Sequence, residues 1–272
     1  MSFLIRLLEI LDTSAEVPGL YGAFHIVSLV LIAILTFFAC RYGKNSSHDK
    51  VCNVLLWTAI TVIVLEIYKQ INYTFRVEDG SLVIDYQWYA FPFQFCSTPM
   101  YIGLLAGFFR KGKFHDALCS YLATFALFAG LAVMVYPGDI YVDTIGINLQ
   151  TTVCHGSMIV TAAYLFATGH VKLEHKTILR ALPVFAVAIT IAVLLNELAV
   201  IIGIAPEETV NMFYVSRHFD STLPVYSLVH NAVPFPLNLV IYICGFSLIA
   251  YLMLLIAMGV HKLTHKSKPI AV

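Results

Sequence analysis

The residues with the clearest chemical potential lie at positions 91–100, FPFQFCSTPM, where a thiol and several polar groups interrupt an apolar segment. Cys96 stands three residues before Pro99, and Gln94 lies two residues before the thiol. Because proline has no N–H, we expect Pro99 to leave the carbonyl of Phe95 without its helical partner and to bend a helix there. Gln94 is then a candidate hydrogen-bond donor to a developing oxyanion. The stretch therefore predicts a reactive or binding centre.

A cysteine nucleophile needs a base within hydrogen-bond reach and a group that orients the base. His155 is the candidate base, because it lies about as deep in its own apolar segment as Cys96 does in another. Glu66 or Glu197 would orient the imidazole and favour its charged form, which in turn favours the thiolate. Without such partners, burial in apolar surroundings would leave Cys96 an inert packing residue, which is the alternative interpretation.

The composition indicates that membrane-spanning helices must position these residues. The 272-residue chain is 60% hydrophobic and only 12% charged, with a mean hydropathy of +0.84, which is typical of a polytopic membrane protein. A span needs about 20 mostly apolar residues to cross about 30 Å of hydrocarbon. We predict an all-α, seven-transmembrane helix bundle in a single domain, residues 1–272. The predicted spans are residues 20–40, 52–73, 89–109, 114–136, 148–169, 178–204 and 234–260, each with approximate bounds.

Residues outside the spans complete the predicted organisation. Residues 1–17 have the pattern of a short interfacial amphipathic helix and lack the long apolar region and cleavage site of a signal peptide. The six cysteines lie in or beside apolar segments, which argues against a disulfide framework.

Basic residues predict the orientation of the spans. The loops after the first, third and fifth spans and the C-terminal tail hold twelve of the sixteen Lys and Arg residues. We therefore predict an outside N-terminus, a cytoplasmic C-terminus and a multi-pass protein of the plasma membrane. The twelve are Arg41, Lys44, Lys50, Arg110, Lys111, Lys113, Lys172, Lys176, Arg180, Lys262, Lys266 and Lys268.

Counting about 1.5 Å per residue from the outer ends of the spans places polar residues of five spans at a common depth. Ionisable groups at this depth are costly and normally face a bundle interior or a water-filled cavity. We therefore predict one shared site in the outer half of the membrane. Its expected members are His25, Glu66, Cys96, His155 and Glu197, with Asn196 beside the last.

Several members of this layer also have simpler interpretations. Asn196 is typical of a hydrogen bond between helices, and Glu66 and Lys69, three residues apart, would neutralise each other on one helix. His25, near the interface, is typical of a capped histidine. Two other functions stay open: a transporter or sensor that uses Glu66, Lys69 and Glu197, or a hydrolase whose histidines and glutamates bind zinc. We expect no metal, no other cofactor and no nucleic-acid partner.

The loop at residues 205–233 is long and rich in aromatic residues, including Phe213, Tyr214 and Phe219. Loops of this length in compact proteins are often lids or binding loops, and a hydrated connection is the alternative. We include Tyr214 among the expected substrate contacts.

Short motifs along the chain resemble those of a known family. They are FHIVSLVL at 24–31, LEIYK at 65–69, FPFQFC at 91–96, CHGSMIV at 154–160 and NMFY at 211–214. In their order and topology they resemble the YwaF-like bacterial membrane proteins and their animal relative, transmembrane protein 164.

The resemblance implies a membrane acyltransferase that moves fatty acyl chains between phospholipids, or a related lipid hydrolase, in a bacterial membrane. It implies Cys96 as the acyl-accepting nucleophile and His155 as the base. Glu66 and His25 would be supporting polar residues, and the expected partner is a membrane lipid.

Overall fold

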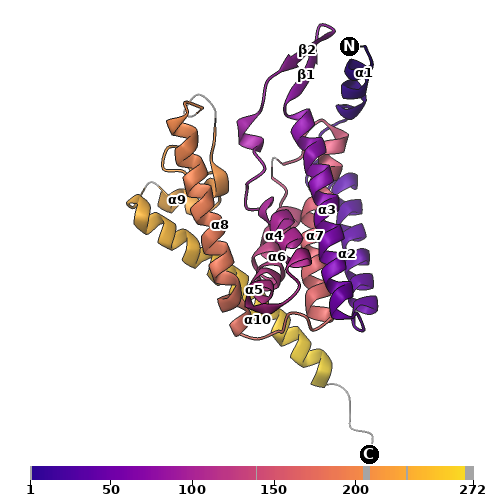
Figure 1. The fold of residues 1–272 in the computed structure, drawn as a ribbon, viewed down its shortest axis with the longest axis vertical. Helices are drawn as coiled ribbons and strands as arrows, with labels where there is room; N and C mark the ends of the chain where they lie inside the picture. The colour runs from indigo at the N-terminus through magenta and orange to yellow at the C-terminus, as the bar shows by residue number, and fades with distance from the viewer. Residues whose placement is uncertain (1, 139, 205–208, 231, 267–272) are drawn as a thin grey trace, which may run out of the picture.

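The computed structural model describes residues 2–138, 140–204, 209–230 and 232–266. Lys268 of the predicted basic tail and positions 205–208 and 231 of the predicted aromatic loop lie outside the described residues. Within the described part, the chain is largely helical and has one short two-stranded sheet (Figure 1). The elements are α1 (Ser2–Leu11), α2 (Ala23–Gly43), α3 (His48–Asn72), β1 (Phe75–Glu78), β2 (Ser81–Ile84), η1 (Trp88–Ala90), α4 (Thr98–Phe108), α5 (Gly112–Ala123), α6 (Phe125–Val135), α7 (Ile145–Ala167), α8 (Lys176–Ile201), η2 (Met212–Tyr214), α9 (Tyr226–His230) and α10 (Phe235–Lys266).

Among the described residues, five helical segments are long and apolar enough to cross a membrane. They are α2, α3, the combined α5–α6 segment, α8 and most of α10. These segments confirm a helical membrane protein, but they are fewer than the seven predicted spans. α4 has 11 residues, about 16 Å of helix, which is shorter than the hydrocarbon layer. α7 has 23 residues but lacks the apolar composition of the other spans.

The polar composition of α7 follows from its central position. α7 packs against α2, α3, α5 and α6, and Figure 1 shows it beside α2 and α3. Its buried face includes Asn148, Gln150, Thr151 and His155. A helix that its neighbours shield from lipid can hold such side chains, because they find partners inside the protein. The polar composition therefore marks α7 as a helix of the bundle interior.

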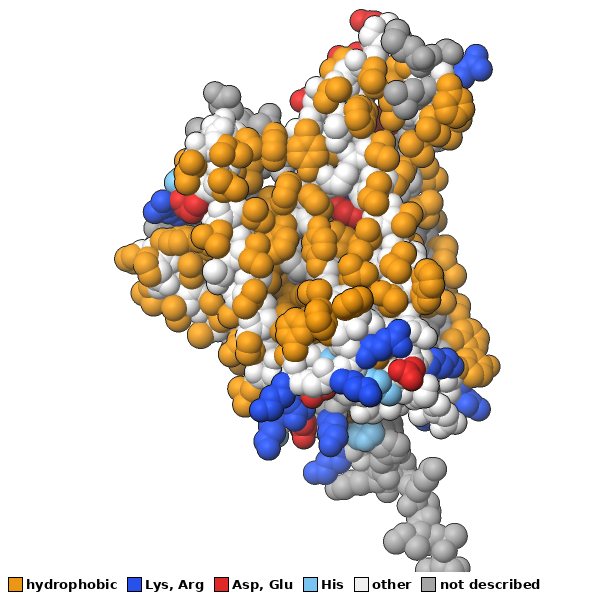
Figure 2. Space-filling view, in the orientation of Figure 1, with side chains coloured by type: hydrophobic (Ala, Val, Ile, Leu, Met, Phe, Trp, Pro, Cys, Tyr) orange, Lys and Arg blue, Asp and Glu red, His pale blue; other side chains and the backbone are white. Residues whose placement is uncertain are grey.

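In contrast to α7, the outer faces of the long helices are apolar. Figure 2 shows hydrophobic side chains over the faces of the long helices, with Lys and Arg gathered towards one end. Only 17% of the α2 span is buried in the protein, and Phe37 and Leu35 are 64% and 56% exposed. An apolar surface of this extent on a long helix requires a lipid environment.

A β-hairpin follows α3. β1 and β2 pair antiparallel with Glu78 opposite Ser81. The turn residues Asp79 and Gly80 both have positive φ (49° and 73°), as a type I′ turn requires. α1 confirms a helix within the predicted N-terminal segment, and the hairpin contacts it. Both lie at the end of the molecule opposite the last turns of α10 (Figure 1). The hairpin was not predicted, although an Asp-Gly pair is a strong signal for one.

Gly130 should be essential for the packing of α6 against α7. A Cβ atom at this position would lie 2.7 Å from the carbonyl oxygen of His155 and 2.9 Å from the Met158 side chain. Gly130→Ala should therefore destabilise the protein by about 1–3 kcal/mol, through overpacking against a backbone that cannot yield. The measurement is thermal unfolding of the purified protein in detergent.

Gly245→Ala is the matched control in α10, because no described atom lies within 4 Å of a Cβ added there. It should be neutral or should stabilise the helix by about 0.5–1 kcal/mol. Equal melting temperatures for the two variants would contradict the close approach of α6 and α7.

Candidate active site

A cavity of about 500 Å³ lies between α3, α6, α7, α10 and the irregular segment before α4. Much of its wall is apolar and includes Phe95, Phe128, Ile147 and Phe246. Its polar lining brings together six of the predicted residues, which are Glu66, Lys69, Gln94, Cys96, His155 and Tyr214. A largely apolar cavity of this size with a few convergent polar groups has the usual form of a ligand site.

Residues 91–97 are irregular, which corrects the prediction that the third span is helical throughout. α4 begins at Thr98, and Pro99 occupies its first turn, where the missing N–H costs no helical hydrogen bond. The carbonyl of Phe95 has a partner, because the Thr98 hydroxyl donates to it (3.0 Å). Pro99 therefore starts a helix instead of bending one, and Cys96 lies on irregular backbone at the cavity wall.

His155 lies on the buried face of α7 and is held through one ring nitrogen. Its Nδ1 is 2.7 Å from the carbonyl oxygen of Thr151, and a carbonyl only accepts, so Nδ1 carries the proton. The neutral ring then has an unprotonated Nε2, which is the form of a general base. The group that orients the ring is thus the Thr151 carbonyl, where Glu66 or Glu197 was predicted. Thr151 also lines the cavity, and its part in the site was missed.

Glu66 is a buried charge at this site, and three side chains satisfy it. Lys69 Nζ lies 2.8 Å from Oε1, the Gln70 amide donates to the same oxygen (2.8 Å), and the Gln150 amide donates to Oε2 (3.1 Å). A cation and two amide donors compensate the cost of burying a carboxylate. The predicted pairing of Glu66 with Lys69 is therefore present. Gln150 was missed, although an amide in an apolar helix itself indicates an internal partner.

Gln94 joins two irregular segments of the chain. Its amide donates to the carbonyl of Asn211 (3.2 Å), and its own carbonyl oxygen accepts from the N–H of Phe213 (3.0 Å). These bonds hold η2 against the segment before α4, and Tyr214 of η2 lines the cavity. Gln94 is thus a positioning residue for one cavity wall, while its role as an oxyanion donor stays a prediction.

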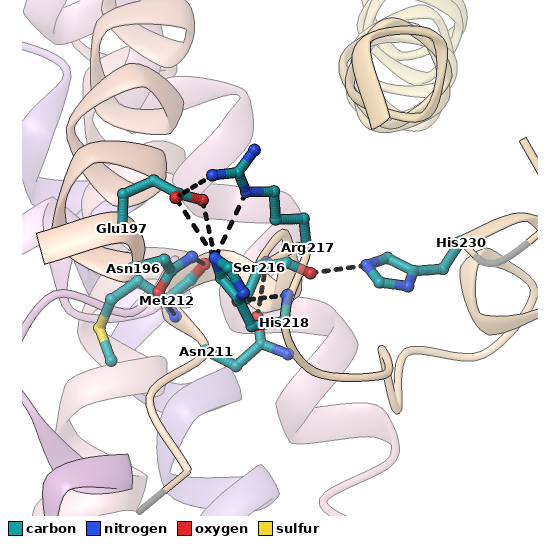
Figure 3. A network of polar contacts seen from close by, with 8 residues as sticks. All are labelled: Asn196, Glu197, Asn211, Met212, Ser216, Arg217, His218 and His230. Carbon is teal, nitrogen blue, oxygen red and sulfur yellow. Dashed lines mark hydrogen bonds and ion pairs between the residues drawn. The ribbon is translucent and has the colours of Figure 1, made fainter. Parts of the chain in front are cut away.

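Figure 3 shows the polar network that anchors this loop to α8. The side chain of Asn196 bonds both the N–H (2.7 Å) and the carbonyl (3.1 Å) of Met212. Glu197 pairs with Arg217 (2.6 Å) and with His218 (3.3 Å). Asn196 and Glu197 are not among the described residues that line the cavity. The structure therefore places them outside the cavity lining, in contacts that fix the loop.

His25 also lies outside the cavity lining described above. Its Nδ1 accepts from the N–H of Tyr21 (3.0 Å), and its Nε2 donates to the carbonyl of Met134 (2.9 Å). Both ring nitrogens of this fully buried residue are engaged, which matches its simpler role as a capped histidine at the start of α2. The zinc ligand set proposed from the sequence does not assemble in the part of the chain that the structure describes.

These features define a helical membrane protein with a largely apolar cavity and a cysteine and a histidine in its lining. The chain belongs to the TMEM164 family, whose family model matches residues 20–258. This match confirms the resemblance seen in the motifs. No curated protein and no solved structure matches the chain significantly.

Asn196→Ala should loosen the loop around η2. The change leaves the N–H and the carbonyl of the buried Met212 without their partner, which costs about 1–3 kcal/mol. Hydrogen–deuterium exchange should rise at residues 211–216 and stay unchanged in α7. Thr190→Ala is the control, because that exposed hydroxyl bonds within its own helix, to the Ala186 carbonyl (2.9 Å). The anchoring role is wrong if both variants exchange alike.

Proposed function

We propose that this protein is a cysteine-dependent acyltransferase or lipid hydrolase that acts on phospholipid acyl esters within the membrane. The observation that carries the proposal is that Cys96 and His155, from different elements, line one largely apolar cavity. A thiol and an unprotonated imidazole nitrogen are the pair that nucleophilic catalysis needs, and apolar walls suit a fatty acyl chain. The acyl transfer that the sequence resemblance implies agrees with this reading.

In the first half of the reaction, the thiol proton of Cys96 passes to Nε2 of His155. The thiolate attacks the carbonyl carbon of the ester, a C–S bond forms, and negative charge gathers on the carbonyl oxygen. Collapse of this intermediate breaks the ester C–O bond, and the lysophospholipid oxygen leaves with the proton from Nε2. The acyl chain is then a thioester on Cys96.

In the second half, a hydroxyl from another lipid or from water attacks the thioester. Nε2 of His155 takes the hydroxyl proton, the new C–O bond forms, and the C–S bond breaks. The thiolate of Cys96 then recovers its proton from the imidazolium. The apolar wall limits water around the thioester, which favours a lipid acceptor over hydrolysis.

We further propose seven crossings, with the N-terminus outside and the C-terminus cytoplasmic, in a bacterial plasma membrane. α4 with its preceding irregular segment forms the third crossing, and α7 forms the fifth. Non-helical backbone is tolerated at membrane depth where it is buried in protein or lines a cavity, and several residues of the 91–97 segment line this one. The basic side chains gathered towards one end in Figure 2 support the cytoplasmic placement of that end.

A transporter or lipid-binding sensor is the second candidate function, because the Glu66–Lys69 pair lines the same cavity. In that case the charged pair would contact the ligand, and Cys96 would serve only in packing. The two proposals differ in the substitution that abolishes function. The transporter requires Glu66→Gln to be severe and Cys96→Ala to be silent.

Cys96→Ala should abolish the transfer of labelled acyl chains between phospholipids in proteoliposomes, because the nucleophile is gone. It should also abolish the acyl thioester that forms on the protein from a labelled phospholipid. Cys244→Ala, at an exposed cysteine on α10, is the control and should behave as wild type. The covalent mechanism is wrong if Cys96→Ala keeps wild-type acyl transfer.

His155→Ala should slow formation of the acyl-enzyme by about 10²–10⁴-fold, the usual effect of losing a general base. Single-turnover formation of the acyl thioester on Cys96 from a labelled phospholipid measures this rate. The control is His175→Asn, at an exposed histidine whose Nδ1 bonds the Tyr251 hydroxyl (2.8 Å). An unchanged rate in His155→Ala would remove His155 from the mechanism.

A further inference from the structure

Three histidines from separate elements meet near the basic loops of the chain. His48 is the first residue of α3, His115 lies in α5, and His170 lies between α7 and α8. One ring nitrogen of each lies within 4.8 Å of the others, and no second group of this kind occurs among the described residues. Glu66 lies 18 positions after His48 in α3, so about 27 Å of helix divides this cluster from the acyl site.

Backbone carbonyls orient two of these rings. His115 Nδ1 donates to the Ala106 carbonyl (3.0 Å), so Nε2 is its lone-pair nitrogen, and this atom lies 2.7 Å from His170 Nε2. His48 Nε2 donates to the Arg110 carbonyl (2.5 Å), which leaves Nδ1 as the lone-pair nitrogen of that ring. Metal-binding histidines are usually held in this way, through the nitrogen that does not bind the metal.

Two buried thiols lie beside the rings. Cys119 Sγ is 3.5 Å from His115 Nε2, and Cys52 Sγ is 3.6 Å from His48 Nε2. In a tetrahedral zinc site, with Zn–N near 2.0–2.1 Å and Zn–S near 2.3 Å, neighbouring ligand atoms lie about 3.3–3.6 Å apart. The spacing of Cys119 from His115 already has this value, but the Cys119 sulfur is not among the three ligand atoms that lie within 4.8 Å of one another, so it must approach the other rings to complete the site. The two ring nitrogens at 2.7 Å would need to separate by about 0.6 Å.

The cluster can accept a cation although basic residues surround it. Arg110 is paired with Asp49 (3.5 Å) and with Asn53 (2.6 Å). Neutral imidazole is the form that binds a metal, and a thiolate from Cys119 would offset part of the charge of a bound cation.

We propose that His48, His115 and His170, with the Cys119 thiolate as fourth ligand, bind a divalent metal ion of the zinc type. Imidazole nitrogen with thiolate sulfur is a ligand set that zinc prefers, and four protein ligands make a closed, structural site. Binding releases the thiol proton of Cys119 to water and moves the shared proton of the two facing rings to His170 Nδ1. The ion ties α3, α5 and the α7–α8 loop together, and it replaces the expectation that this chain binds no metal.

The test uses the full-length protein in detergent, purified through a tag without histidine and stripped with a chelator. Titration with Co²⁺ should give one ion per chain, with a tetrahedral visible spectrum and a thiolate-to-cobalt charge-transfer band. Zn²⁺ should displace the cobalt and raise the melting temperature. Cys119→Ser should lose the charge-transfer band but keep cobalt bound.

His48→Asn and His115→Asn should each weaken cobalt binding by more than about 100-fold, beyond the loss expected from an outer-shell change. His48 is the exposed member, so its variant keeps the test valid if His115→Asn fails to fold. His175→Asn, on the same α7–α8 connection, should bind like wild type. Wild-type protein that binds no cobalt, or binds it no better than His48→Asn, overturns the site. A cobalt spectrum without the charge-transfer band overturns Cys119 as a ligand.

Discussion

The side chain of Gln94 donates one hydrogen bond and accepts another, and together they hold η2 against the irregular segment before α4. The cavity depends on both segments. An apolar bundle offers no water to the N–H and C=O groups of a non-helical backbone, so these groups need partners in the protein. Gln94 supplies such partners to η2, and Asn196 supplies two more from α8. The cavity wall persists because these side chains replace helical hydrogen bonds that the irregular segments give up.

Glu66 shows the same requirement for a charge. Gln70 and Gln150 donate to its two oxygens from different helices, so compensation of the carboxylate also fixes the position of α3 relative to α7. Gln70 in addition donates to the carbonyl of Ala90 (2.9 Å), which attaches η1 to α3. One buried acid therefore organises the polar side of the cavity, and this holds for either function considered for it.

Composition was enough to predict a helical membrane protein, because long apolar segments such as α2 and α8 have few other uses. Counting depth placed Cys96, His155 and Glu66 at one level, and all three line one cavity. The same count included His25 and Glu197, because depth does not say which way a side chain points around its helix. It also assumed a continuous helix before Pro99, and a proline marks a helix start as readily as a bend.

The backbone of η2 stores strain, since Phe213 and Tyr214 both have positive φ (57° and 58°). Such conformations cost about 1–2 kcal/mol for each residue with a side chain. The hydrogen bonds from Gln94 and Asn196 that oppose this strain contribute about 1 kcal/mol each. The strain and the hydrogen bonds that oppose it are therefore of similar size, so the conformation of η2 depends on Gln94 and Asn196. The positive φ values at Phe213 and Tyr214 thus make η2 the part of the cavity wall that depends most directly on side-chain hydrogen bonds.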